Sequence, residues 1–104
     1  MKLSYSELTT MVNLLKREER ESAESCERTA KDVAEAKRRF QEWVRDYRKR
    51  AAKAEVDDET AEKTIDQAYA EMVTPHEEND RVARAYHSDI EHIMYKFTGG
   101  TFEI

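Results

Sequence analysis

The first 74 residues of the chain contain no glycine and no proline, and their apolar residues recur mainly at steps of three and four. Both features favour α-helix, because glycine and proline weaken helices most and a step of three to four residues returns to the same helix face. The sequence predicts one long helix from Ser6 to Ala54, about 75 Å long at about 1.5 Å per residue. Ser4 and Glu7 have the spacing of a capping box at its start.

Two breaks divide the rest of the chain. Residues 55–58 interrupt the apolar pattern, and Asp57 or Asp58 is suited to cap a second helix, because its carboxylate can accept bonds from the first backbone amides. Further on, Thr74 and Pro75 form a helix-restart signal, with threonine as the cap and proline as the first helical residue. The signal predicts either a kink or a new helix, which Gly99 and Gly100 would end.

Charge is segregated along the chain in a way that predicts how the helices pair. Segment 37–53 has eight basic and two acidic residues, a net charge of +6, whereas segment 55–71 has seven acidic residues and one basic residue, a net charge of −6. A chain reversal near residue 56 lays these segments side by side, with Lys53 near Glu59 and Arg50 near Glu62. Apolar periodicity and charge therefore both predict an antiparallel helical hairpin.

At 104 residues with mixed charges and nine aromatic side chains, the chain is expected to fold as one domain and not to be disordered. We expect an all-α, elongated hairpin over residues 1–98, whose second arm is broken or kinked at Pro75, with a short tail over 99–104. Each helix of a hairpin covers only one face of the other. The leftover aromatic residues therefore predict a homodimer that forms a helical bundle or coiled coil.

The bulk properties predict a soluble, cytoplasmic protein. Cys26 is the only cysteine and cannot form an internal disulfide, which is typical of a reducing compartment. No stretch approaches the roughly 20 apolar residues that span a bilayer, so no membrane association is expected. A net charge of −5 is too mild to indicate a nucleic-acid partner by itself.

Two clusters could carry metal-dependent chemistry. His87 and Glu91 share a helix face, and Asp89 and His92 have nearly the spacing of the Glu-x-x-His pairs that hold metals in helical bundles. Neither pair has a matching partner on the first helix, so a solvated polar face is the simpler interpretation. The glutamates between residues 18 and 27 alternate with arginines at salt-bridge spacing and are interpreted in the same way. Cys26 lies on the apolar seam and is expected to pack as a small hydrophobe. We therefore predict no enzyme activity, no cofactor and no metal.

The basic segment with interleaved aromatic residues is the strongest candidate for a binding surface. Arginine and tryptophan are favoured anchors at protein interfaces. The predicted partner-binding residues are Arg38, Arg39, Trp43, Arg45, Arg48 and Arg50. The same face over 37–53 could instead follow a phosphate backbone and stack on bases, which keeps nucleic-acid binding as the alternative.

These observations predict a non-enzymatic interaction module, which is a small helical adaptor or inhibitor that binds and modulates a larger protein complex. By analogy of size and charge, a bacterial or phage regulator such as an anti-defence protein would suit this description.

Overall fold

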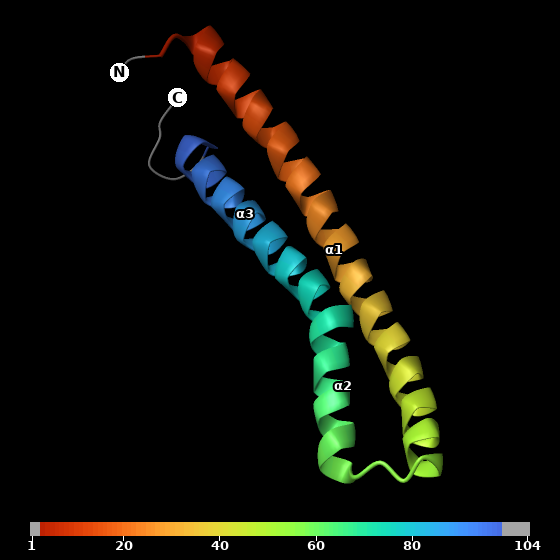
Figure 1. The fold of residues 1–104 in the computed structure, drawn as a ribbon. Helices are drawn as coiled ribbons and strands as arrows, with labels where there is room; N and C mark the ends of the chain where they lie inside the picture. The colour runs from red at the N-terminus through yellow and green to blue at the C-terminus, as the bar shows by residue number, and fades with distance from the viewer. Residues whose placement is uncertain (1–2, 99–104) are drawn as a thin grey trace. The chain divides into compact units, whose positions relative to one another are not determined.

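The computed structural model describes residues 3–98, and this part of the chain is all-helical, with no strand. The helices are α1 (Tyr5–Lys53), α2 (Asp58–Met72) and α3 (Thr74–Thr98), drawn from red through green to blue in Figure 1. The all-α prediction is confirmed, and both ends of α1 lie within one residue of the predicted bounds. The predicted stop at Gly99 and Gly100 and the tail lie outside the described residues.

The start of α1 has the predicted capping box. The Glu7 backbone N–H donates to Ser4 Oγ over 3.1 Å, and the Ser4 N–H donates to Glu7 Oε1 over 3.3 Å. Each side chain thus satisfies a backbone donor of the other residue, which is how this motif stabilises a first turn.

The end of α1 is closed by a backbone motif that uses a residue with positive φ. Glu55 has φ 56°, its N–H donates to the Ala52 carbonyl over 3.3 Å, and the Val56 N–H donates to the Ala51 carbonyl over 3.0 Å. This pair of bonds is the Schellman arrangement, in which glycine usually occupies the left-handed position because it has no Cβ.

Replacing Glu55 by glycine is therefore expected to stabilise the fold by about 1 kcal/mol, the order of the cost of a left-handed non-glycine residue. Urea unfolding monitored by circular dichroism measures the change. Glu55→Ala is the matched control, because it removes the carboxylate but keeps Cβ. An alanine variant as stable as the glycine variant would contradict this explanation.

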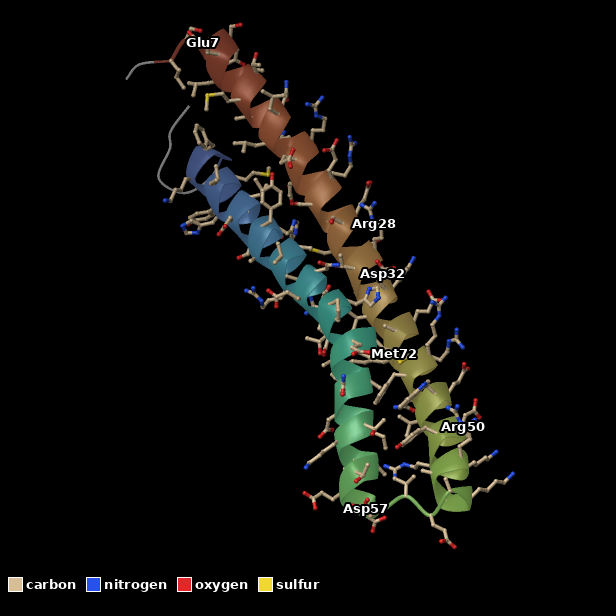
Figure 2. The ribbon with its side chains drawn as sticks, viewed as in Figure 1. Glu7, Arg28, Asp32, Arg50, Asp57 and Met72 are labelled. Atoms are coloured by element: carbon tan, nitrogen blue, oxygen red, sulfur yellow. The ribbon has the colours of Figure 1, made fainter. Side chains whose placement is uncertain are left out.

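Asp57 caps α2, as predicted. Its carboxylate accepts the Thr60 backbone N–H over 3.2 Å. Hydrogen bonds from the Thr60 side chain and then from its backbone N–H lower the pKa of Asp57 below the ordinary aspartate value. Figure 2 labels Asp57, the cap residue directly before α2, and Met72, where α2 ends.

Because this pKa is lower in the folded chain than in the unfolded chain, the cap stabilises the fold above the unfolded-state pKa and loses that effect as the pH falls through the folded-state pKa. We expect Asp57→Ala to melt below the parent at about pH 7 and the difference to shrink towards about pH 2. Thermal melts of both proteins at each pH test this. A difference that does not change with pH would mean that the carboxylate charge does not contribute.

A single residue, Val73, separates α2 from α3. Its N–H still donates to the Tyr69 carbonyl over 2.8 Å, and its own carbonyl accepts the N–H groups of His76 and Glu77 over 3.0 and 3.1 Å. Pro75 has no N–H and its ring clashes with the carbonyl four residues earlier, so one continuous helix is interrupted here. Residues 58–98 thus form two helices, α2 and α3, and not one kinked helix. Thr74 is the first residue of α3 and not the cap before it, because the Val73 carbonyl already accepts the first bonds.

The chain forms two compact units, each of which is described by itself. One combines α1 up to Arg28 with α3 from Arg81 onwards, and the other comprises Thr29–Asp80. The buried apolar residues of the 29–80 unit are Ala36, Ala51, Ile65 and Val73, and Ile90 is buried in the first unit. No helix within residues 3–98 has the length and apolar character needed to cross a membrane.

Within the 29–80 unit, α1 and α2 contact each other through aromatic rings and ion pairs. Phe40 and Tyr69 meet edge to face with centroids 5.2 Å apart, and Arg48 Nη2 lies 3.3 Å from Glu62 Oε1. The expected proximity of Arg50 to Glu62 is therefore replaced by a pair that involves Arg48. Two residues correspond to about 200° around a helix, so Arg48 and Arg50 leave α1 on different flanks.

Candidate interaction site

Four aromatic side chains form a cluster in the 29–80 unit. Trp43 and Tyr47 stack one turn apart on α1, with centroids 5.0 Å apart and planes 3° from parallel. Phe40 continues the row beside Trp43 at 6.4 Å and meets Tyr69 of α2 edge to face. All four rings are half-buried, so the cluster combines contact between α1 and α2 with partly exposed aromatic surface.

Tyr69 also has a polar contact with α3. A hydrogen bond to Glu77, together with burial, raises the pKa of the Tyr69 hydroxyl above its ordinary value. Lys37 Nζ lies 4.0 Å from the Glu77 carboxylate. These polar contacts add to the ring contact between Phe40 and Tyr69.

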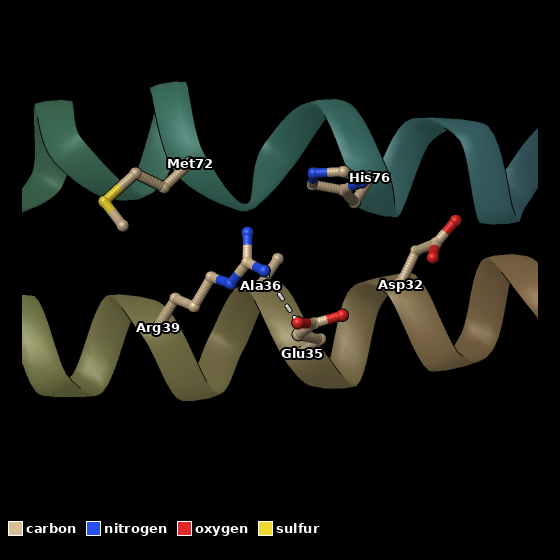
Figure 3. Close-up of a pocket in the computed structure, with 6 residues that line it drawn as sticks. All are labelled: Asp32, Glu35, Ala36, Arg39, Met72 and His76. Atoms are coloured by element: carbon tan, nitrogen blue, oxygen red, sulfur yellow. Dashed lines mark hydrogen bonds and ion pairs between the residues drawn. The ribbon is translucent and has the colours of Figure 1, made fainter.

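Arg39 lines the first groove of this unit, which has a volume of about 360 Å³ (Figure 3). The remaining lining residues are Asp32, Glu35, Ala36, Met72 and His76. Arg39 Nη2 lies 2.8 Å from Glu35 Oε1 on the same helix. Two carboxylates thus face one guanidinium and one imidazole, so the groove has no strong preference for a charged ligand of either sign.

A second groove of about 480 Å³ has a different character. Phe40, Val44 and Ile65 supply apolar surface, whereas Gln41, Arg45 and Arg48 supply polar side chains. Arg45 is exposed, and no carboxylate within residues 3–98 pairs with it. Arg48 has only the exposed, monodentate pair with Glu62, a type of contact that contributes little stability. This groove can therefore accept an apolar group with an acidic neighbour.

The predicted partner-binding residues do not share one face. Arg39 lines the first groove, and Arg45 and Arg48 line the second. Arg38 is exposed and pairs with Glu42 at 2.8 Å on its own helix. Arg50 is also exposed. The basic side chains of segment 37–53 point in several directions around α1, because residues adjacent in sequence point about 100° apart.

A polar contact in the other unit was missed by sequence reasoning. Ser22 is only 4% exposed, and its Oγ lies 2.6 Å from Nδ1 of His87, while His87 Nε2 lies 2.6 Å from Glu91 Oε1. His87 was interpreted as part of a solvated polar face. The structure instead places its Nδ1 against Ser22, a buried position of α1 that carries a hydroxyl and not an apolar side chain.

This arrangement contains the residue types of a serine hydrolase but does not resemble its site. Ser22 Oγ donates to the Glu19 carbonyl over 2.9 Å, and the serine lies in the middle of α1. Backbone N–H groups inside a helix bond to its own carbonyls, so they cannot stabilise an oxyanion. The contact is structural in character. Nor does any group of three or more His, Cys, Asp and Glu side chains within residues 3–98 have the arrangement of a metal site.

Tyr86 forms a further contact between the two helices of this unit. Its hydroxyl donates to Glu18 Oε1 over 2.6 Å. That bond, then burial, then the charges of Glu18 and Glu21 raise the pKa of Tyr86 above the ordinary tyrosine value. Glu18 therefore has a partner on α3 and is not simply part of a solvated glutamate row.

Comparison with known proteins identifies no relative: no family model, no curated protein and no solved structure matches the chain.

Proposed function

We propose that the protein is a non-enzymatic helical module that binds an acidic segment of a larger protein and modulates that partner. The observation that carries the proposal is the second groove, where Phe40, Val44 and Ile65 lie beside two arginines. Arg45 has no carboxylate partner within the described residues, so an incoming glutamate or aspartate would not have to displace one.

The groove has the composition of a binding surface for an amphipathic peptide. Apolar side chains of the partner would lie over Ile65 and Val44, and its carboxylates would reach Arg45 and Arg48. Arginine suits this role because its planar fork can bind a carboxylate through two parallel hydrogen bonds. The partner segment would therefore alternate acidic and apolar residues.

A tagged pull-down from the native lysate, with and without nuclease, tests this function. We expect a stoichiometric protein partner that resists nuclease and is lost when Arg45 and Arg48 are both replaced by alanine. Arg17→Ala combined with Arg20→Ala is the matched control, since it removes two exposed charges from α1 outside the 29–80 unit. Equal loss in both double variants would indicate non-specific charge attraction and contradict the proposal.

Nucleic-acid binding is the second candidate, and the Trp43–Tyr47 stack is the observation that favours it. Bases stack on aromatic rings at about 1–3 kcal/mol per base. Trp43 is the only tryptophan, so its fluorescence reports this surface alone. Quenching by a single-stranded oligonucleotide that weakens steeply with salt would support this candidate, and unchanged fluorescence would exclude binding at the stack.

We further propose that the whole chain is an antiparallel hairpin that acts as a homodimer. Five apolar side chains are buried in the described residues, whereas six large apolar side chains are exposed. Such exposure is typical of surfaces that associate. Sedimentation equilibrium tests the dimer independently of partner capture.

A further inference from the structure

His87 of α3 has a contact at each of its two ring nitrogens. Nδ1 lies 2.6 Å from the hydroxyl oxygen of Ser22 on α1, and Nε2 lies 2.6 Å from Oε1 of Glu91, one turn further along α3. Ser22 is 4% exposed, so water has little access to its hydroxyl. The protons in these contacts therefore have to come from the groups of the protein itself.

The number of protons available decides which of these atoms donate. A serine hydroxyl carries one proton, and Ser22 donates it to the Glu19 carbonyl over 2.9 Å. The hydroxyl can then only accept from His87, so Nδ1 carries a proton. The Glu91 carboxylate has no proton to donate, so Nε2 carries one as well. A histidine ring with a proton on both nitrogens is the positively charged imidazolium.

The two distances agree with a charged ring. Hydrogen bonds from N–H to oxygen are ordinarily about 2.9–3.0 Å long, whereas those from a charged donor are shorter. Both contacts of His87 measure 2.6 Å. If the ring lost the proton on Nδ1, this nitrogen could keep its contact only by accepting the proton that Ser22 gives to Glu19.

We infer that the contact between Ser22 and His87 is a proton-dependent joint between α1 and α3, which is complete only while the His87 ring is an imidazolium. Histidine is the side chain that ordinarily titrates near neutral pH, so the joint responds between about pH 5.5 and about pH 7.5. The inference is independent of the proposed function, because both residues lie outside the 29–80 unit.

The direction of the pH effect follows from the contacts of the charged ring. The imidazolium holds both contacts together in the folded chain and not in the unfolded chain, so folding favours the protonated ring. The joint therefore stabilises its unit at the lower pH and loses this effect as the pH rises.

The other charged groups around the contact ordinarily titrate outside this range. Five titratable side chains within residues 3–98 lie one helical turn from Ser22 or His87, namely Glu18, Glu19 and Cys26 on α1, and Arg84 and Glu91 on α3. Glutamate ordinarily titrates below this range, and cysteine and arginine titrate above it. The pH effect at this contact is therefore assigned to His87.

Melting curves at two pH values test the joint. His87→Asn is the test variant, because an asparagine amide can still donate to Ser22 but carries no charge. We expect the parent to melt above H87N at about pH 5.5, and the difference to shrink by at least about 4 °C at about pH 7.5. His92→Gln is the matched control, since it removes an exposed histidine from the same helix, and its difference from the parent should not change with pH. A difference for H87N that is equal at both pH values overturns the inference.

Nitrogen NMR of the His87 ring is a second measurement, and it needs no variant. Long-range proton–nitrogen spectra distinguish the imidazolium from the neutral ring and show which nitrogen keeps its proton. We expect both nitrogens to be protonated while the ring has nuclear Overhauser contacts with Ser22, and these contacts to weaken as the ring loses a proton. A neutral ring that keeps the contacts unchanged would show that Ser22 turns its proton towards Nδ1, and the joint would then not depend on the charge.

Discussion

A chain carrying Val73→Asp is expected to be largely unfolded at room temperature. Val73 is 0% exposed, so the new carboxylate would lie in a site without water. An unpaired buried charge costs about 3–5 kcal/mol, a large share of the roughly 5–15 kcal/mol by which small domains are stable. Helical circular dichroism and the urea midpoint measure the loss. Val73→Ala should cost less, about 2 kcal/mol, because it removes two methyl groups without adding a charge.

The matched control for this experiment is Val82→Asp. Val82 is 53% exposed on α3, so its carboxylate would remain hydrated and should cost less than about 1 kcal/mol in dilute solution. Equal destabilisation at both positions would show that helix propensity and not burial is responsible. That result would contradict the conclusion that burial of Val73, at the junction between α2 and α3, stabilises the fold.

The junction also illustrates what sequence could predict and what it could not. Proline at position 75 predicts a kink or a break in the helix, since proline lacks the N–H and clashes with the preceding turn. Which residue becomes fully buried at the break depends on how α1, α2 and α3 pack within the 29–80 unit. That packing made Val73 the most completely buried apolar residue described, although it did not stand out by composition.

The second large effect is expected for Ser22 and His87, whose side chains are joined at 2.6 Å. Replacing His87 by leucine leaves a buried hydroxyl with one partner fewer, and replacing Ser22 by alanine leaves an imidazole nitrogen without its partner. Each single change should cost about 1–3 kcal/mol. The double variant S22A/H87L should be nearly as stable as the parent, because both polar groups then disappear together.

A double-mutant cycle by urea unfolding measures the coupling between these two residues. Strictly additive losses would show that the hydrogen bond contributes nothing beyond packing. A cycle of Thr9→Ala with Lys96→Ala provides a comparison, because Thr9 donates only within its own helix and both side chains are exposed. That pair should give a coupling energy close to zero.

Local signals were predictable, and most distant pairings were not. The capping box at Ser4 and the cap at Asp57 depend on residues three positions apart, so spacing alone indicated them. The contact between Ser22 and His87 joins residues 65 positions apart, and it depends on the alignment of two helices. Charge segregation predicted that α1 and α2 would exchange ion pairs. It misplaced the partner of Glu62 by two positions, because long side chains tolerate several alignments.

The candidate site was predictable only in part. The sequence indicated that segment 37–53 is rich in arginine and aromatic residues, and the structure places five of its side chains around one groove, namely Phe40, Gln41, Val44, Arg45 and Arg48. Ile65 completes that groove from α2, and no feature of its own segment marked it as part of a site. The exposure of several apolar residues on α3 was missed for a different reason. The apolar residues of that helix form a stripe wider than one neighbouring helix can cover, and periodicity does not distinguish covered from uncovered positions.

The polar contact between Ser22 and His87 also bears on how α1 and α3 could slide past one another. Aliphatic side chains pack acceptably after a displacement of one heptad, whereas a serine and a histidine can bond only where they meet. We therefore expect S22A/H87L to retain its melting temperature yet to sample several displacements, with broadened amide resonances along α3. Thermodynamic stability and a unique alignment of the helices would then be separate properties of this chain. The Ser22 hydroxyl would account for much of the unique alignment.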